Sequence, residues 1–370
     1  MKYDTCALML AVLALVLLGV LMVFSTSAVG GASGGLLNRQ IAFATAGFIF
    51  LLLFSRFDYH RFADPLVYVT LVLFSFALLL LVLVPGLGVE VDGARRWLQI
   101  KSWRFQPSEL AKFALIVHLA VKMTQNREEI KRFWRGFMPP ITIAGSFSAL
   151  VLLERDLGVP AVMMATAWVM MCVAGVRWRY LLLSAAPIAA VGGLLVVFAP
   201  HRLIRLLAFI NPWEYRSGAG WQLIQSYSAF ARGGVWGQGM GAGEQKLGYL
   251  PAAHTDFIFP VVGEELGLVG TLSVVALFVL LTWLSYKIAV NAMDHFGALL
   301  AAGIGMMISF QAAFIMAVTI GLLPTKGLPL PFISYGGTSL VIFMMMVGVL
   351  MNIGAHAVAT GVRKPLMTAS

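Results

Sequence analysis

The sequence predicts an all-α polytopic membrane protein with about ten transmembrane helices. Composition is the first observation. Of 370 residues, 60% are hydrophobic and only 11% are charged, and the mean hydropathy is +0.89. Soluble domains are usually about 45–50% apolar and about 25% charged. The second observation is a series of apolar runs close to the roughly 20 residues that a helix needs to cross the hydrocarbon core. We therefore expect a single integral membrane domain over residues 1–370.

The ten apolar runs are separated by short polar segments, with one long interruption after the seventh run. They are Thr5–Phe24, Ile41–Phe57, Pro65–Val84, Ser108–Lys122, Phe137–Leu153, Gly158–Val176, Tyr180–Phe198, Phe257–Tyr286, Gly297–Leu323 and Ser334–Thr360. The interruption, residues 199–255, is predicted to be a large extracytoplasmic loop. It opens with HRLIRLLAF, in which Arg202 and Arg205 share one helical face, and this pattern favours a short helix lying in the membrane interface.

Lysines and arginines in the short loops indicate the orientation. They concentrate on the face that holds both termini, which are therefore predicted to be cytoplasmic. The two long loops of the outer face nevertheless carry cations as well, among them Arg95 and Arg96. Because positive charge there opposes the usual bias, we expect it to have a use, although ordinary solvated loop charge is an equal alternative. The net charge of +10 suits anionic headgroups or a phosphorylated substrate better than nucleic acid.

Asp256 stands where a glycine-rich polar run, Gly233 to Gly243, leads into an apolar helix. A carboxylate at the edge of a membrane helix is costly, so it indicates a functional site. The functional interpretation is a general base at the outer membrane surface; the alternative is that Thr255 or Asp256 caps the following helix. The glycine run lacks the spacing of a dinucleotide site and is interpreted as a flexible hinge or a close-approach turn.

Two further acidic positions lie near this end of the membrane. Glu264 and Glu265 are deeper in the same helix, where at least one should face a cavity or a basic partner, and a structural role is favoured. Glu109 and Lys112 stand three residues apart on one helical face. Lys112 is predicted either as a counter-ion of Asp256 or Glu265 or as the partner of Glu109.

Lys326 lies between prolines and a glycine, in a loop that cannot be helical. A fixed cation there could bind phosphate. The alternative is a lysine whose side chain extends to the membrane interface. The two cysteines have no CxxC spacing, and no zinc, serine-triad or nucleotide-loop pattern is present, so no metal ligand is predicted.

Several motifs in order make the chain resemble the SEDS family (shape, elongation, division and sporulation) over almost its whole length. They are Ala94-Arg95-Arg96-Trp97, Phe105-Gln106-Pro107-Ser108-Glu109-Leu110-Ala111-Lys112, Asp156-Leu157-Gly158, His254-Thr255-Asp256-Phe257-Ile258-Phe259, Gly263-Glu264-Glu265-Leu266-Gly267 and Ser334-Tyr335-Gly336-Gly337. The run Leu323-Pro324-Thr325-Lys326-Gly327 resembles the division branch (FtsW) more than the elongation branch (RodA).

The resemblance implies a peptidoglycan glycosyltransferase of the bacterial inner membrane that polymerises lipid II on the extracytoplasmic side. It also implies a class B penicillin-binding protein and other division or elongation proteins as partners. We expect Asp256 to be the catalytic base. The substrate-binding candidates are Arg95, Arg96, Lys112, Lys326 and His254, and the supporting residues are Glu109, Glu264, Glu265 and Ser334. No motif demands a cofactor, although Mg²⁺ or Mn²⁺ could help to neutralise a pyrophosphate.

Two positions depart from the family pattern. The family often has glutamate where Ala252 stands and proline where Arg155 stands.

Other function classes fit the sequence less well. A lipid II flippase would use Lys112, Glu264 and Glu265 as a relay, and a non-catalytic division scaffold would not need Asp256.

Overall fold

The computed structural model describes residues 2–27, 33–91, 93–100 and 103–359. Most of the chain is helical. The α-helices are α1 Lys2–Ser27, α2 Ser33–Arg56, α3 Pro65–Leu83, α4 Pro107–Gln125, α5 Met138–Leu153, α6 Gly158–Val173, α7 Trp178–Val197, α8 Pro200–Ile210, α9 Trp221–Gly233, α10 Ile258–Val290, α11 His295–Thr319 and α12 Gly337–Ala359. Three short helical turns, η1 Tyr59–Ala63, η2 Arg127–Glu129 and η3 Phe133–Phe137, lie between them.

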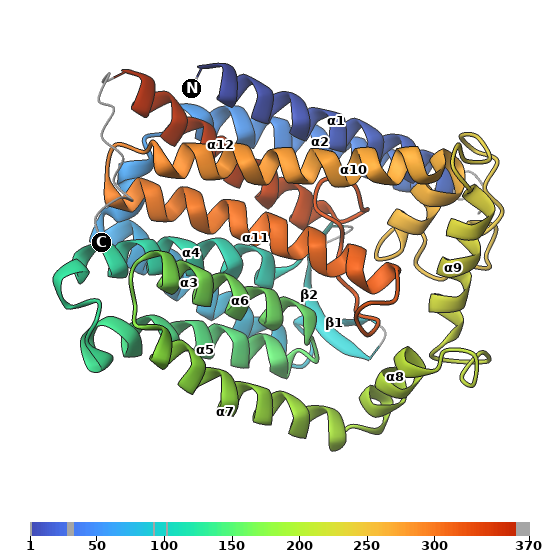
Figure 1. The fold of residues 1–370 in the computed structure, drawn as a ribbon, viewed down its shortest axis with the longest axis horizontal. Coiled ribbons are helices and arrows are strands. Elements are labelled where there is room, and N and C mark those ends of the chain that lie inside the picture. Colours follow the sequence, from blue (N-terminus) through green and yellow to red (C-terminus); the bar gives the residue numbers. More distant parts are fainter. Residues whose placement is uncertain (1, 28–32, 92, 101–102, 360–370) are drawn as a thin grey trace.

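The long helices run side by side along the longest axis, and α9 crosses their ends (Figure 1). Helices α4, α11 and α12 form the interior: α11 contacts α4, α6, α10 and α12, whereas α2 and α3 present most of their surface outward. The first turn of α1 and the last turns of α12 meet at the same end, where Thr5 packs against Gly354. The start of α1 and the end of α12 therefore lie at the same end of the bundle, and the cytoplasmic position of both termini stays a prediction.

Each of the ten predicted spans falls on a helix. Within the described residues, seven helical segments are long and apolar enough to cross a membrane, namely α1, α2, α3, α5 with η3, α10, α11 and α12. The other three predicted spans correspond to α4, which carries charges, and to α6 and α7, which are shorter apolar helices. The number of ten crossings stays a prediction. The end of the last predicted span, Thr360, lies outside the described residues.

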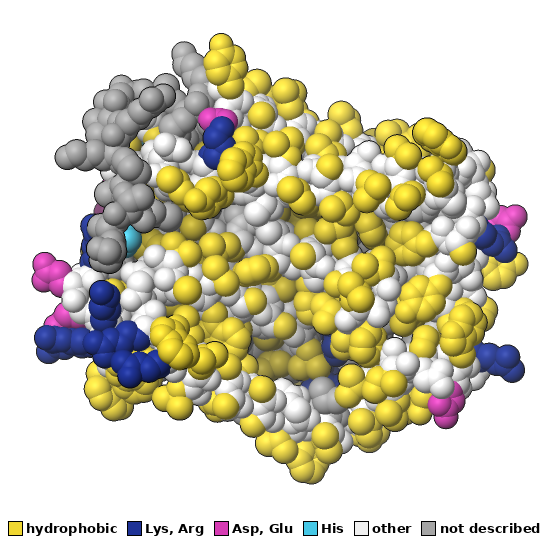
Figure 2. Space-filling model, viewed as in Figure 1, with side chains coloured by type: hydrophobic (Ala, Val, Ile, Leu, Met, Phe, Trp, Pro, Cys, Tyr) yellow, Lys and Arg dark blue, Asp and Glu magenta, His cyan; other side chains and the backbone are white. Residues whose placement is uncertain are grey.

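The surface supports a membrane location. Hydrophobic side chains cover the sides of the helices, and charged side chains gather at the two ends of the long axis (Figure 2). An apolar band between two charged ends is the pattern that a bilayer requires of a helical membrane protein. The chain is therefore a multi-pass membrane protein.

A small antiparallel sheet was not predicted. Strands β1 Gly88–Val91, β2 Ala94–Ile100 and β3 Trp103–Phe105 pair in the order β1-β2-β3 between α3 and α4. The sheet carries Arg95 and Arg96 on its middle strand. Residues 199–255, predicted as a loop, contain α8, as expected from the amphipathic pattern, and also α9, which was not predicted.

Candidate active site

Asp256 lies immediately before α10, which begins at Ile258 with Phe257 at the N-cap position. Thr255 and Asp256 therefore stand two residues and one residue before the N-cap position, and capping by either stays a prediction. Its side chain is half-buried against the loop that follows α11. A methyl group placed on Gly327 would lie 2.9 Å from Asp256 Oδ2 and 3.8 Å from Arg96 Nη1. The carboxylate and the guanidinium thus border the same glycine, although they are 160 positions apart in the printed sequence.

Arg96 reaches this place from β2 and is fixed by two contacts. Its Nη1 lies 3.5 Å from Asp156 Oδ2, and its Nη2 donates to the carbonyl of Arg155 (3.0 Å). Asp156 is 4% exposed and accepts from the backbone N–H of Gly158 (2.9 Å), which starts α6. One carboxylate therefore caps a helix and orients the arginine at the same time.

Lys326 adjoins Gly327 and adds a second cation. Burial lowers the pKa of its ammonium, and so do the positive charges of Arg205, Arg202 and Arg96, whereas Asp156 opposes them; together they bring the pKa to about 8. Arg202 and Arg205 belong to α8, so this helix brings its basic face toward Lys326. Their shared face was noted in the sequence, but not their place in the site. The result is a concentration of cations beside Asp256 that suits a polyanionic ligand.

Glu154 is a site residue that the sequence did not single out. It is 1% exposed, and neither carboxyl oxygen has a hydrogen-bond partner. Burial, with the charge of Asp156 added, raises its pKa to about 9, so it is a neutral acid at pH 7. Burial could not be inferred from its position at the end of an apolar run.

Arg95 has a different partner from Arg96. Its Nε lies 3.2 Å from Glu90 Oε2, on the neighbouring strand β1. The pairing of β1 with β2 is irregular here: Val89 lies opposite Trp97 and Glu90 opposite Arg95, so the register skips Arg96. Such a β-bulge changes the direction of side chains along a strand. That Arg95 and Arg96 hold one pyrophosphate stays a prediction.

His254 and Ser334 join the two loops of the site. The backbone N–H of Tyr335 donates to the carbonyl of His254 (2.8 Å), and the two rings meet edge to face. Ser334 Oγ donates to the carbonyl of Thr255 (2.6 Å) and accepts from the N–H of Leu330 (2.8 Å). Burial lowers the pKa of the His254 imidazole, so it is neutral at pH 7. Ser334 supports the loop, as predicted, and a substrate contact of His254 stays a prediction.

Lys112 is fully buried and pairs with Glu109 (2.8 Å), which corresponds to the local alternative from the sequence. Its Nζ also donates to Gln311 Oε1 (2.6 Å), and Gln311 Nε2 donates to the carbonyl of Pro329 (2.9 Å). Lys112 therefore supports the loop of Lys326 from inside the bundle. Its expected role as counter-ion of Glu265 is wrong, because Lys246 lies there instead; its role as a substrate ligand stays a prediction.

Glu264 and Glu265 hold the glycine run in place. Glu264 accepts from the N–H groups of Glu244 (3.0 Å) and Gln245 (3.1 Å). Glu265 accepts from Lys246 Nζ (2.6 Å), Ser25 Oγ (2.5 Å) and the N–H of Gly241 (3.0 Å). The expected basic partner is confirmed for Glu265, and the structural role of the two acids stays a prediction that these contacts favour.

The glycine run is a close-approach segment, which is one of the two interpretations from the sequence; a hinge stays a prediction. Helix α10 is interrupted at Gly267, whose φ of 66° and ψ of −162° are not helical. The run supplies the lost hydrogen bonds: Gly234 O accepts from Leu268 N (2.9 Å), and Gly239 N donates to Glu265 O (3.0 Å). At Gly237 a side chain would overlap the Glu265 backbone, so only glycine fits. Backbone polar groups at a break in a membrane helix need such partners.

The residues that depart from the family pattern have unusual backbone angles. Arg155 and Ala252 adopt the left-handed region, with φ of 62° and 55°, and Phe332 shares it at 67°. Arg155 and Ala252 precede Asp156 and Asp256 by one and four residues, and Phe332 precedes Ser334 by two. Non-glycine residues in this region store strain that clusters at functional sites.

Comparisons with known proteins agree with this geometry. The FtsW/RodA/SpoVE family, described as cell cycle protein, matches residues 6–359. The chain belongs to this family. It is 44% identical to a probable peptidoglycan glycosyltransferase FtsW of Geobacter sp. (strain M18) over 96% of this chain and 97% of that protein. It is 38% identical to stage V sporulation protein E of Bacillus subtilis (strain 168), over 96% of this chain and 99% of that protein.

Solved structures of the family share the fold. The rod shape determining protein RodA of Thermus thermophilus has a TM-score of 0.70 and 28% identity, covering 94% of this chain and 95% of that one. A chain in "Structural coordination of polymerization and crosslinking by a peptidoglycan synthase complex" has a TM-score of 0.79 and 28% identity, covering 95% and 97%. Membership in the FtsW/RodA/SpoVE family thus rests on sequence and fold together.

Proposed function

We propose that this protein is a peptidoglycan glycosyltransferase that polymerises lipid II into glycan strands for septal wall synthesis. The observation that carries the proposal is Asp256 beside Gly327, with Arg96 and Lys326 on the same side of the fold. The names of the full-length relatives support both the activity and the division role.

The chemistry of lipid II explains why one carboxylate is enough. The donor sugar carries an α-linked pyrophosphate, and the polymer linkage is β, so a single in-line displacement inverts the anomeric carbon. Glycosidases need an acid and a base because their leaving group is poor. Pyrophosphate leaves readily, so one base and fixed positive charge suffice.

Asp256 accepts the proton of the acceptor GlcNAc 4-hydroxyl as that oxygen attacks the donor carbon. Arg96 and Lys326 hold the pyrophosphate that departs, and Arg202 and Arg205 on α8 add positive charge at the same place. A divalent cation, Mg²⁺ or Mn²⁺, would add charge neutralisation at the pyrophosphate.

The site faces the extracytoplasmic side in this proposal, and both termini are cytoplasmic. Its support is the distribution of Lys and Arg in the short loops together with the shared end of α1 and α12. The bacterial inner membrane is the location. The partner is a class B penicillin-binding protein, which the synthase-complex structure supports, with other division proteins assembling around the pair.

The test is polymerisation of purified lipid II by the reconstituted protein, with and without the partner and with chelator. We expect glycan strands from the wild type and none from Asp256→Ala or Asp256→Asn protein that still folds. Movement of lipid II across vesicles without polymer would instead establish a flippase. Full polymerisation by either Asp256 variant would end the assignment of the base.

A further inference from the structure

Arg95 and Arg96 are neighbours on β2 but contact different carboxylates. Arg96 contacts Asp156 on the side of the active site, whereas Arg95 pairs with Glu90 within the hairpin. Arg95 remains 41% exposed in its side chain despite this pair. Its guanidinium has five N–H donors, and the contact to Glu90 uses its Nε. It is thus able to bind a further anion.

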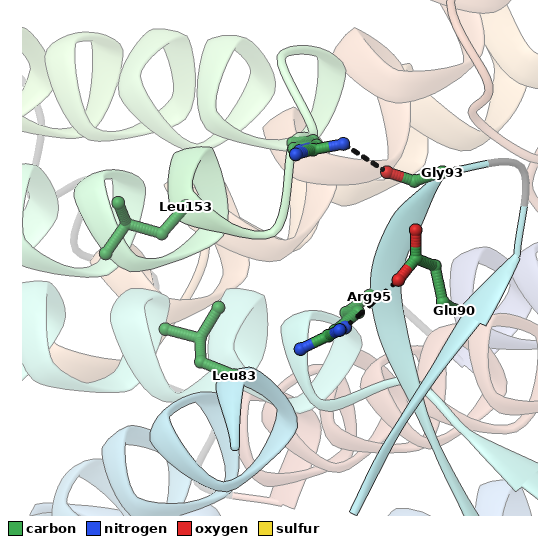
Figure 3. A pocket seen from close by; sticks show the side chains of 6 residues that line it. Leu83, Glu90, Gly93, Arg95 and Leu153 are labelled. Atoms are coloured by element: carbon green, nitrogen blue, oxygen red, sulfur yellow. Dashed lines mark hydrogen bonds and ion pairs between the residues drawn. The ribbon is translucent and has the colours of Figure 1, made fainter. Parts of the chain in front are cut away.

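A cavity of about 280 Å³ lies on the Arg95 side, between the hairpin and the ends of two membrane helices (Figure 3). Leu83, Glu90, Gly93, Arg95, Leu153 and Arg155 line it. The close-up shows the arginine that bonds to Gly93 on one side of the space, and Arg95 on the other (Figure 3). Leu83 ends α3 and Leu153 ends α5, so the apolar wall lies at the edge of the membrane.

The lining suits an amphiphile with a phosphate head. Two guanidinium groups and one carboxylate leave a net positive charge, and guanidinium groups bind phosphate in a bidentate manner. Leu153 is 65% exposed and offers an apolar surface that continues along α5. The cavity of about 280 Å³ has room for a phosphate head.

Arg155 connects this cavity to the active site. Its Nη1 donates to the carbonyl of Gly93 (3.0 Å), while its own carbonyl accepts from Arg96 Nη2 (3.0 Å). The backbone of Arg155 is left-handed. Its side chain contacts the hairpin at Gly93, and its carbonyl contacts Arg96. The wall of the cavity and the arginine beside Asp256 are therefore parts of one hydrogen-bonded unit.

We propose that this cavity, with Arg95 and Arg155 as ligands, binds the phosphate of a polyprenyl lipid, as the site of the second lipid-linked substrate. Two such substrates must be held together for polymerisation, and Arg95 and Arg96 offer a guanidinium to each, because their partners, Glu90 and Asp156, are different. The assignment to a second substrate rests on the proposed function, whereas the binding of a polyprenyl phosphate does not.

Photo-crosslinking from position 153 tests the site directly. Benzoylphenylalanine replaces the exposed Leu153, the purified full chain receives undecaprenyl phosphate in detergent, and mass spectrometry measures the crosslinked fraction. We expect the lipid to be captured, with about tenfold weaker binding in Arg95→Gln protein, because a charge-assisted contact is lost. Glu90→Gln should strengthen binding, because it removes the competing carboxylate. Arg104→Gln, an exposed arginine on β3 of the same sheet, is the matched control and should change nothing.

The competitors identify the ligand. Undecaprenol, which lacks phosphate, and phosphatidylglycerol should compete poorly with undecaprenyl phosphate. Equal capture in wild-type and Arg95→Gln protein would overturn the phosphate site, and equal competition by phosphatidylglycerol would overturn the role in substrate binding. Undecaprenyl phosphate is not polymerised, so its capture does not depend on catalytic activity. A protein that captures the lipid but does not polymerise lipid II would contradict only the proposed function.

Discussion

Two groups of carboxylates flank the first turns of α10, and their surroundings differ. Glu264 and Glu265 are fully buried, and each accepts several hydrogen bonds from the glycine run or from Lys246. Asp256, before the helix, is half-buried and borders Gly327 and the guanidinium of Arg96. A fully buried acid that accepts several hydrogen bonds contributes to the fold, whereas a partly exposed acid beside fixed cations can reach a substrate. We therefore expect substitutions in the two groups to have different effects.

The sharpest test of this difference is Asp256→Asn, which keeps the shape and removes the base. We expect the polymerisation rate on lipid II to fall by about 10²- to 10⁴-fold, the usual contribution of a general base. The melting temperature of the purified protein should stay unchanged. A variant that is less stable but retains its rate per folded molecule would place Asp256 among the structural acids.

Glu265→Gln should show the opposite result. It leaves the Lys246 ammonium, 8% exposed, without its anionic partner, and such a loss costs about 3–5 kcal/mol of unfolding free energy. Denaturant titration in detergent measures it. The double variant Glu265→Gln with Lys246→Met should recover much of the stability. If Glu265→Gln abolished turnover at full stability, the structural assignment would be wrong.

Two glycines offer a matched pair of smaller perturbations. A methyl on Gly327 meets Asp256 Oδ2 at 2.9 Å, and a methyl on Gly243 meets Glu264 Oε2 at 2.8 Å. Gly327→Ala should displace the base and slow polymerisation about tenfold with little effect on melting, because a small misplacement of a catalytic group is costly. Gly243→Ala should cost about 1–3 kcal/mol of stability through overpacking. If Gly327→Ala lost stability while Gly243→Ala slowed polymerisation, the distinction between Asp256 and Glu264 would be wrong.

The smallest expected effect concerns pH and Lys326. Its pKa of about 8 means that the ammonium is charged below pH 8 and neutral above it. Affinity for undecaprenyl pyrophosphate, measured by competition against lipid II, should therefore weaken as pH rises through about 8. Lys326→Arg keeps its charge across this range and should abolish the decline. An identical decline in the arginine variant would exclude Lys326 as its source.

Much of the site was predicted where the signal is local. The three-residue spacing of Glu109 and Lys112 predicted their pair, and the helical face of HRLIRLLAF predicted α8. Pairings between distant segments were missed. Lys246 meets Glu265 across a folded loop, and Ser25 reaches the same carboxylate from α1, 240 residues away in sequence. Neither spacing leaves a periodic signal.

The neighbouring Arg95 and Arg96 show the same limit at short range. They were expected to act together because they adjoin, but on the unpredicted strand β2 they contact different carboxylates, Glu90 and Asp156. The hairpin is short, flanked by membrane helices and irregular in register at Arg96, so no alternation reveals it in the sequence. Glu154 was missed for a related reason, since only its neighbours in space make it buried and neutral.

The sequence by itself determined the membrane helices, the identity of the exposed aspartate and the presence of cations near it. Apolar length and residue type are local properties, and the bilayer acts on each segment separately. Only the tertiary structure decided which acid meets which cation, which carboxylates are fully buried, and that two adjacent arginines contact different carboxylates. Those outcomes depend on burial and on contacts between segments far apart in the chain, where the free energy of each charge is set by its neighbours in space.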